Sequence, residues 1–183
     1  MRRVGSLMSF SLCSLAAFTL CSCSSMPSYE SDGMYASATT YSEYSSRIPQ
    51  HIASNEKTVM VDPNVHVWGA YEGGNLVKSG LASAGSDYCS DLGRRCHTSS
   101  GTFRVFSLGE PDCKSRIFPI PKGGAPMPYC MYFSHGMALH GVPDSEVGEG
   151  NYSHGCVRMH VADAEWLRYN FVNIGTKVVV KPY

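Results

Sequence analysis

The sequence has no net charge, no nucleotide-binding motif and no long apolar segment. Its 183 residues hold 15 lysines and arginines against 15 aspartates and glutamates, so no strong electrostatic field is present to attract nucleic acid. No glycine-rich loop of the kind that cradles phosphate groups is found. The apolar run from Val4 to Leu20 is too short and too rich in serine for a membrane span. These features argue against nucleic-acid binding, nucleotide-dependent chemistry and a transmembrane helix.

Closely spaced pairs of metal ligands are also missing. The C-terminal part carries several side chains of the types that ligate zinc, namely His135, His140, His154, Cys156 and His160. None of them forms a tight pair next to a second such pair, which is the spacing typical of zinc sites. We therefore expect no metal ion and no other cofactor.

The N-terminal segment is typical of a signal peptide rather than of a folded domain. Arg2 and Arg3 give it a positive start, and an apolar run with small residues follows. We expect residues 1–22 to be removed when the protein is exported.

A possible lipid anchor follows directly. The residues Leu20-Cys21-Ser22-Cys23 resemble the lipobox of bacterial lipoproteins, which implies cleavage before Cys23 and a lipid on that cysteine. Such a lipid would hold the protein on the periplasmic face of the inner or outer membrane. Ser24, where inner-membrane lipoproteins carry aspartate, resembles the outer-membrane sorting pattern. Ordinary secretion with cleavage near Ser25 is the alternative, and both interpretations predict export.

Export changes the interpretation of the remaining cysteines. Beyond Cys23 there are five: Cys89, Cys96, Cys113, Cys130 and Cys156. Four can form disulfides, and an odd cysteine in an exported protein is either intermolecular or reactive. Proximity along the chain favours the pairs Cys89–Cys96 and Cys113–Cys130 among the three possible connectivities, which leaves Cys156 as a candidate reactive thiol.

Residues 23–56 are expected to form a flexible tether. This segment is rich in serine and tyrosine, poor in aliphatic residues and without a persistent period of 2 or 3.6. The remaining residues, 57–183, are expected to form the folded domain.

The folded domain is predicted to be mainly β. Strands are expected over 58–61, 65–71, 76–83, 102–107, 129–133, 137–140 and 176–180, with a hairpin turn at 72–75 where glycines supply positive φ. Apolar residues Val161, Ala164, Leu167 and Phe171 recur at spacings of three, three and four, which predicts a helix of about three turns.

Two short motifs near the C-terminus carry the residues needed for thiol chemistry. They are His140-Gly141 and Ser153-His154-Gly155-Cys156. A free cysteine is mostly protonated at neutral pH, and a nearby imidazole can take its proton and hold the thiolate in an ion pair. Gly155 lets the backbone approach a substrate, so the N–H groups of Gly155 and Cys156 are candidate oxyanion-hole donors.

These motifs resemble the signature of the L,D-transpeptidases, which cross-link bacterial peptidoglycan. The resemblance implies a β-sandwich-like catalytic domain over residues 57–183, with one substantial helix after the cysteine. It implies that Cys156 is the nucleophile and that His140 is the general base, oriented by the carbonyl of Gly141. His154 and Gly155 would complete the catalytic group.

Four further residues are candidates for substrate binding. Arg158 offers a planar guanidinium to a carboxylate of the stem peptide, although a structural ion pair would explain it equally well. Some family members carry asparagine at this position and others arginine. Ser153 is expected to hydrogen-bond nearby backbone or imidazole. Tyr132 and His135 are either walls of the donor cleft or scaffold.

The resemblance implies acyl transfer from a peptidoglycan tetrapeptide stem, with release of D-alanine and a thioester on Cys156. The acceptor stays open among another stem peptide, a lysine of a lipoprotein, a free D-amino acid and water. Water would make the protein an L,D-carboxypeptidase. A different cysteine peptidase of the wall and a wall-binding lipoprotein without activity also stay open.

Overall fold

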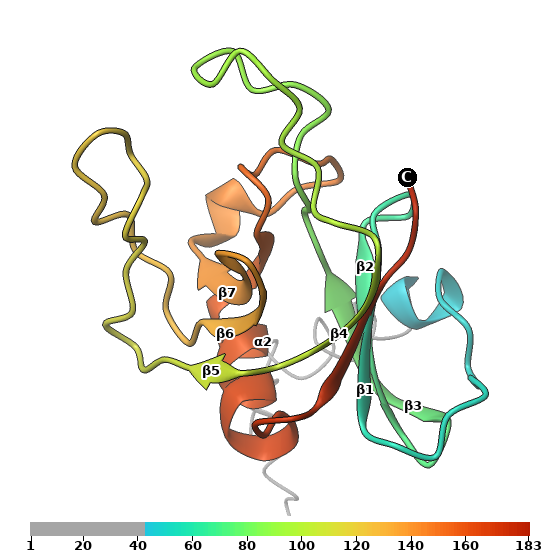
Figure 1. Cartoon of the computed structure of the whole chain (residues 1–183). Helices are drawn as coiled ribbons and strands as arrows, with labels where there is room; N and C mark the ends of the chain where they lie inside the picture. The colour runs from blue at the N-terminus through green and yellow to red at the C-terminus, as the bar shows by residue number, and fades with distance from the viewer. Residues whose placement is uncertain (1–42) are drawn as a thin grey trace, which may run out of the picture. The chain divides into compact units, whose positions relative to one another are not determined.

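Two β-sheets organise the described part of the chain, residues 43–183 of a computed structural model (Figure 1). The first sheet has five strands in the order β3-β2-β1-β9-β4, and the second has four in the order β5-β6-β7-β8. The strands of the first sheet are β1 (Thr58–Asp62), β2 (Val67–Glu72), β3 (Asn75–Leu81), β4 (Gly101–Arg104) and β9 (Lys177–Val180). Those of the second sheet are β5 (Ser107–Leu108), β6 (Met131–Ser134), β7 (Met137–Val142) and β8 (Val157–His160).

The first sheet begins as the predicted meander. β1 and β2 pair antiparallel, and so do β2 and β3. The turn between β2 and β3 places Gly73 at φ 56° and Gly74 at φ 82°, a conformation that glycine adopts without steric cost. β9 returns from the far end of the chain and lies parallel to β1, so the C-terminal strand joins β1 to the edge strand β4.

The chain passes from one sheet to the other at Val105, and here the sequence prediction was wrong. A single strand was expected over 102–107, but the structure has β4 in the first sheet and β5 in the second. The N–H of Val105 donates to Thr176 beside the first sheet, and the N–H of Phe106 donates to Tyr132 in the second. The alternating residues 102–107 therefore pair with strands of two different sheets.

The main core lies between the two sheets and the C-terminal helix. It contains Val59, Val61, Trp68, Ala70, Met131, Phe133, Leu139, Val157, Met159, Val178 and Val180 from the strands, together with Ala164, Leu167 and Phe171 from the helix. The helix comprises α2 (Val161–Trp166) and a π-helical turn, η2 (Leu167–Phe171). The predicted mainly β fold with one helix after the cysteine is thereby confirmed.

Strand β8 was not predicted, yet it positions the site. It spans four residues between the Cys156 motif and the helix, and it lies parallel to β7 with His140 opposite Arg158. The preceding pair of the same two strands, Leu139 and Val157, faces the core. Side chains alternate along strands, so His140 and Arg158 face the opposite side of the sheet.

The segment expected to be a tether is partly packed against the domain. The structure describes its last residues, 43–56, and there Ile48 is 4% exposed and contacts Val67 and Tyr71. The hydroxyl of Tyr71 donates to the carbonyl of Pro49 at 2.7 Å. Ordered structure therefore begins before residue 57. The expected signal peptide, the Cys23 lipidation site and Ser24 lie outside the described residues.

Two loops are closed by disulfides that join Cys89 to Cys96 and Cys113 to Cys130, the pairing expected from their proximity. Cys156 is the free cysteine among the described residues. Two further short elements complete the fold, a 3-10 turn, η1 (Asp144–Glu146), and a helical turn at residues 43–46. Within residues 43–183 no helix has the length and apolar character needed to cross a membrane.

Candidate active site

A cavity of about 820 Å³ lies on the side of the second sheet that faces away from the core. Tyr132, His140, Cys156 and Arg158 line it from the sheet. The loop 109–130 supplies one set of walls, and Pro143, Glu146, Ser153 and His154 supply further lining. Residues of both motifs found in the sequence thus line one cavity.

His140 is oriented by its own neighbour. The ring is 5% exposed, and Nδ1 lies 2.9 Å from the carbonyl oxygen of Gly141. A carbonyl only accepts hydrogen bonds, so Nδ1 carries the proton and Nε2 keeps a lone pair. Burial lowers the pKa of His140 to about 4. The positive charge of Arg158 also lowers it, whereas the hydrogen bond to Gly141 opposes the decrease. The neutral ring is a base with its lone pair at Nε2.

Cys156 directly precedes β8, and its half-buried thiol lies beside the turn between β6 and β7. Sγ lies 3.7 Å from the carbonyl oxygen of Gly136. Burial raises the pKa of the thiol, while a hydrogen bond from the backbone of Ala138 and the charge of Arg158 oppose the increase. Both shifts favour the neutral thiol and the neutral imidazole in the free protein, because burial penalises both charged forms.

The residues just before Cys156 are held by Ser153. Its Oγ donates to the carbonyl of Cys156 at 2.5 Å and accepts the N–H of Gly155 at 3.0 Å. Gly155 has φ 120°, which L side chains rarely adopt. The N–H of Gly155 is engaged, which corrects its expected role as an oxyanion donor. Among the described residues, the N–H of Cys156 makes no hydrogen bond.

His154 links both disulfide-closed loops. Its Nε2 lies 2.9 Å and 3.0 Å from the two carboxylate oxygens of Asp91, which belongs to the Cys89–Cys96 loop. Its ring packs on Phe118 of the other loop, with centroids 4.5 Å apart. His154 therefore acts on the position of these loops, and its Nε2 is not directed to a substrate.

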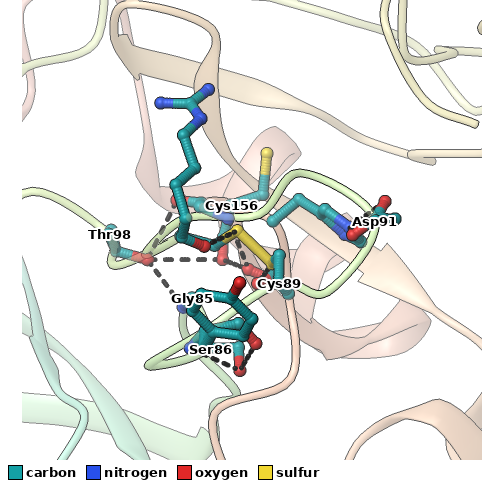
Figure 2. The surroundings of a disulfide bond; sticks show 12 residues. Gly85, Ser86, Cys89, Asp91, Thr98 and Cys156 are labelled. Atoms are coloured by element: carbon teal, nitrogen blue, oxygen red, sulfur yellow. Dashed lines mark hydrogen bonds and ion pairs between the residues drawn. A yellow bond between two sulfur atoms is a disulfide. The ribbon is translucent and has the colours of Figure 1, made fainter. Parts of the chain in front are cut away.

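The Cys89–Cys96 disulfide lies beside the motif (Figure 2). The sulfur of Cys89 is 4.0 Å from the carbonyl oxygen of Ser153. The sulfur of Cys156 points away from this disulfide in Figure 2. The disulfide thus supports the backbone of the motif and leaves the thiol to the cavity.

The expected substrate-binding residues do not all share the cavity. Tyr132 and Arg158 line it beside Cys156, and so does Ser153, although its hydroxyl is engaged with backbone. His135 is exposed in the β6–β7 turn and lines a second cavity of about 340 Å³. The structure therefore separates His135 from the other three.

Cys89, Asp91 and His154 place ligand atoms within 4.8 Å of one another. The sulfur of Cys89 is bonded to Cys96, so it offers no thiolate to a metal ion. The other two side chains are bound to each other. This group does not fit a zinc site.

Sequence reasoning missed Asp91, Thr98 and Phe118. Asp91 and Phe118 contact His154, and Thr98 contacts the backbone of Gly155. All three lie in segments without periodicity, and their positions depend on how the loops cross the sheet. The one signal in the sequence was that Asp91 lies between two cysteines expected to pair.

A comparison with protein families shows which family has this site. The model of the YkuD family, described as the L,D-transpeptidase catalytic domain, matches residues 56–180. The chain belongs to this family. None of the curated proteins compared with the chain matches it.

Solved L,D-transpeptidases share the fold. The L,D-transpeptidase from Xylanimonas cellulosilytica (residues 123–326) is 28% identical, with a TM-score of 0.60 over 74% of this chain and 66% of that one. The enzyme from Mycobacterium smegmatis is 24% identical, with a TM-score of 0.56 over 69% and 59%. L,D-transpeptidase 3 from Mycobacterium tuberculosis, in complex with a faropenem-derived adduct, is 23% identical, with a TM-score of 0.55 over 69% and 60%. The chain spans less than two thirds of each of these structures.

Proposed function

We propose that the chain is a peptidoglycan L,D-transpeptidase with Cys156 as nucleophile and His140 as general base. The observation that carries this proposal is that one cavity holds a free thiol and a buried imidazole with its Nδ1 bound to Gly141. The class of reaction, acyl transfer, is inferred from membership of the YkuD family.

In the first step, Sγ of Cys156 attacks the peptide carbonyl that precedes the terminal D-alanine of a tetrapeptide stem. The thiol proton passes to Nε2 of His140, and the carbonyl oxygen becomes an oxyanion. The C–N bond then breaks, the amine of D-alanine leaves with the proton from His140, and a thioester remains. Because both pKa shifts favour the neutral forms, we expect proton transfer to accompany the attack instead of preceding it.

In the second step, an acceptor amine attacks the thioester carbon. His140 takes a proton from the amine, the C–S bond breaks, and the proton returns to the sulfur. A stem-peptide amine gives a cross-link. Water in place of the amine gives a shortened stem and makes the protein an L,D-carboxypeptidase.

Arg158 is the best candidate to bind a carboxylate of the donor. It lines the cavity, and none of the ion pairs within residues 43–183 includes it, which favours substrate binding over a structural ion pair. Its charge also acts on the pKa values of His140 and Cys156. Tyr132 lines the same cavity and is proposed to contact the donor stem peptide. His135 lines the second cavity, where it is proposed to contact the acceptor.

The lipid anchor and export belong to the same proposal. A lipid on Cys23 and a periplasmic, outer-membrane location would place the domain next to the wall. Mass spectrometry of the mature N-terminus tests this: a diacylated or triacylated Cys23 is expected, and an unmodified serine or methionine would rule it out.

The activity is tested with the chain from residue 24, purified with its disulfides intact and mixed with disaccharide-tetrapeptide. Intact mass should show a thioester on Cys156, and the products should include cross-linked dimers and D-alanine. The Cys156→Ala variant should form neither adduct nor product. Tripeptide without dimers would indicate the carboxypeptidase, and an unmodified wild-type protein with no product would refute the proposal.

A further inference from the structure

Thr98 connects a buried loop to the peptide that precedes the nucleophile. Its side chain is 1% exposed. Oγ1 accepts the N–H of Gly85 at 2.9 Å and donates to the carbonyl of Gly155 at 2.9 Å, with the carbonyl of Cys156 farther away at 3.5 Å. Figure 2 shows the hydroxyl at the centre of these bonds. A threonine hydroxyl has one proton, so the shorter bond to Gly155 receives it.

The carbonyl that Thr98 binds belongs to the same peptide unit as the N–H of Cys156. In a trans peptide these two groups point in opposite directions within one plane. Holding the carbonyl of Gly155 therefore sets the direction of the Cys156 N–H, which makes no hydrogen bond among the described residues. Glycine permits more peptide orientations than other residues do, so the orientation at Gly155 needs an external bond to hold it.

We propose that Thr98 is a positioning residue that holds the Cys156 N–H as an oxyanion donor. The inference rests on the acyl transfer proposed above, because only attack on a carbonyl develops negative charge on oxygen. A donor that is oriented in advance stabilises this charge without reorganising during the reaction. Thr98 touches neither substrate nor thiol, and acts through the Gly155–Cys156 peptide.

The backbone of Thr98 is held by a separate set of bonds, and these provide a matched control. The N–H of Thr98 donates to Oη of Tyr183 at 2.8 Å, and Oη donates to the carbonyl of Gly85 at 2.7 Å. Tyr183→Phe removes these two bonds and keeps the hydroxyl of Thr98 on Gly155. Thr98→Val also removes two bonds, but one of them is the bond to Gly155. Thr98→Ser keeps the hydroxyl.

The test compares two reactions of Cys156 in each variant, both followed by intact mass against a Cys156→Ala baseline. Acylation by p-nitrophenyl acetate passes through an oxyanion, whereas alkylation by iodoacetamide does not. Thr98→Val should acylate at least about tenfold more slowly than wild type and alkylate at the wild-type rate. Thr98→Ser should recover most of the acylation rate, and Tyr183→Phe should retain most of it.

Three results would overturn the inference: unchanged acylation in Thr98→Val, an equal loss of alkylation in that variant, or an equal loss of acylation in Tyr183→Phe. A wild-type protein that no acyl donor modifies at Cys156 would overturn it as well. Failure of the proposed function is separate. If wild type ignores the tetrapeptide but shows the Thr98 effect with p-nitrophenyl acetate, the inference stands and the peptidoglycan substrate is wrong.

Discussion

The site has a floor made by strands and a cover made by loops, and the two are built differently. On the floor, His140 and Arg158 are opposite each other on two parallel strands, and their orientation follows from strand alternation. In the cover, the loops 86–97 and 109–130 contain no strand of either sheet, and each is closed by a disulfide. The floor carries the chemistry, and the cover determines what reaches it and how the motif is held.

The two loops of the cover also differ from each other. The Cys89–Cys96 loop leads into Thr98 and carries Asp91, so it contacts the motif itself. The Cys113–Cys130 loop lines the cavity over a long stretch and contacts the motif through Phe118. We infer that the first loop acts mainly on the rate of acylation and the second mainly on substrate binding.

The largest expected effect comes from the floor. The pKa of His140 is about 4, below its ordinary value of 6.5. Between pH 6.5 and about 4 the unfolded chain binds this proton more tightly than the folded protein does, so the free energy of unfolding falls as the pH drops through that range. The gap corresponds to about 3 kcal/mol. Urea unfolding should show that the free energy of unfolding falls from pH 7 to pH 4 in wild type, and that this fall is smaller by about the same amount in His140→Gln.

The thiol gives a second test of the same pair. Because the pKa of Cys156 lies above its ordinary value of 9.0, alkylation by iodoacetamide should keep rising as pH increases past 9. A preformed ion pair with His140 would instead give a rate that is flat from about pH 5 to 8. That flat profile, or equal acid sensitivity in wild type and His140→Gln, would contradict the neutral pair.

The next effect separates the two loops. Replacing Cys89 and Cys96 by serine should lower the free energy of unfolding by about 2.5 kcal/mol, and replacing Cys113 and Cys130 by about 3 kcal/mol, because the second disulfide closes the longer loop. The first pair should reduce kcat, and the second should raise KM for the tetrapeptide. Steady-state kinetics measure kcat and KM for both double variants, and urea unfolding measures the stability of each. The same kcat and KM pattern in both would remove the distinction between the loops.

The floor was largely predictable from sequence, and the cover was not. The spacing of His140 and Cys156, the short apolar runs of β6 and β7 and the helical period after the motif are all local features, so the sequence indicates them. Strand β8 was missed although Val157-Arg158-Met159-His160 alternates between buried and half-buried side chains, because so short a run directly after the motif was not separated from it. Its existence depends on pairing with β7, which no local signal encodes.

The cover depends on contacts between distant segments. Thr98 and Gly155 are 57 residues apart, and Asp91 and His154 are 63 apart. Polar residues in irregular loops have no periodicity, so nothing in the sequence separates these from their solvated neighbours. The cysteines were the exception, because the parity of their number and their proximity along the chain indicated both the free thiol and the disulfide partners. The shifts in the pKa values of His140 and Cys156 were not predictable for a related reason, since burial is a property of the assembled site.

The smallest expected effect lies within one loop. Asp91→Asn removes the carboxylate that holds His154 and should reduce Cys156 acylation severalfold, with little change in stability because exposed ion pairs contribute little. Asp87→Asn is the matched control, since Asp87 binds His97 in the same loop and does not contact the motif. Stopped-flow acylation of both variants makes the comparison. Equal losses would mean that any charge removed from this loop slows the reaction, whereas a loss confined to Asp91→Asn would show that the loop acts through His154.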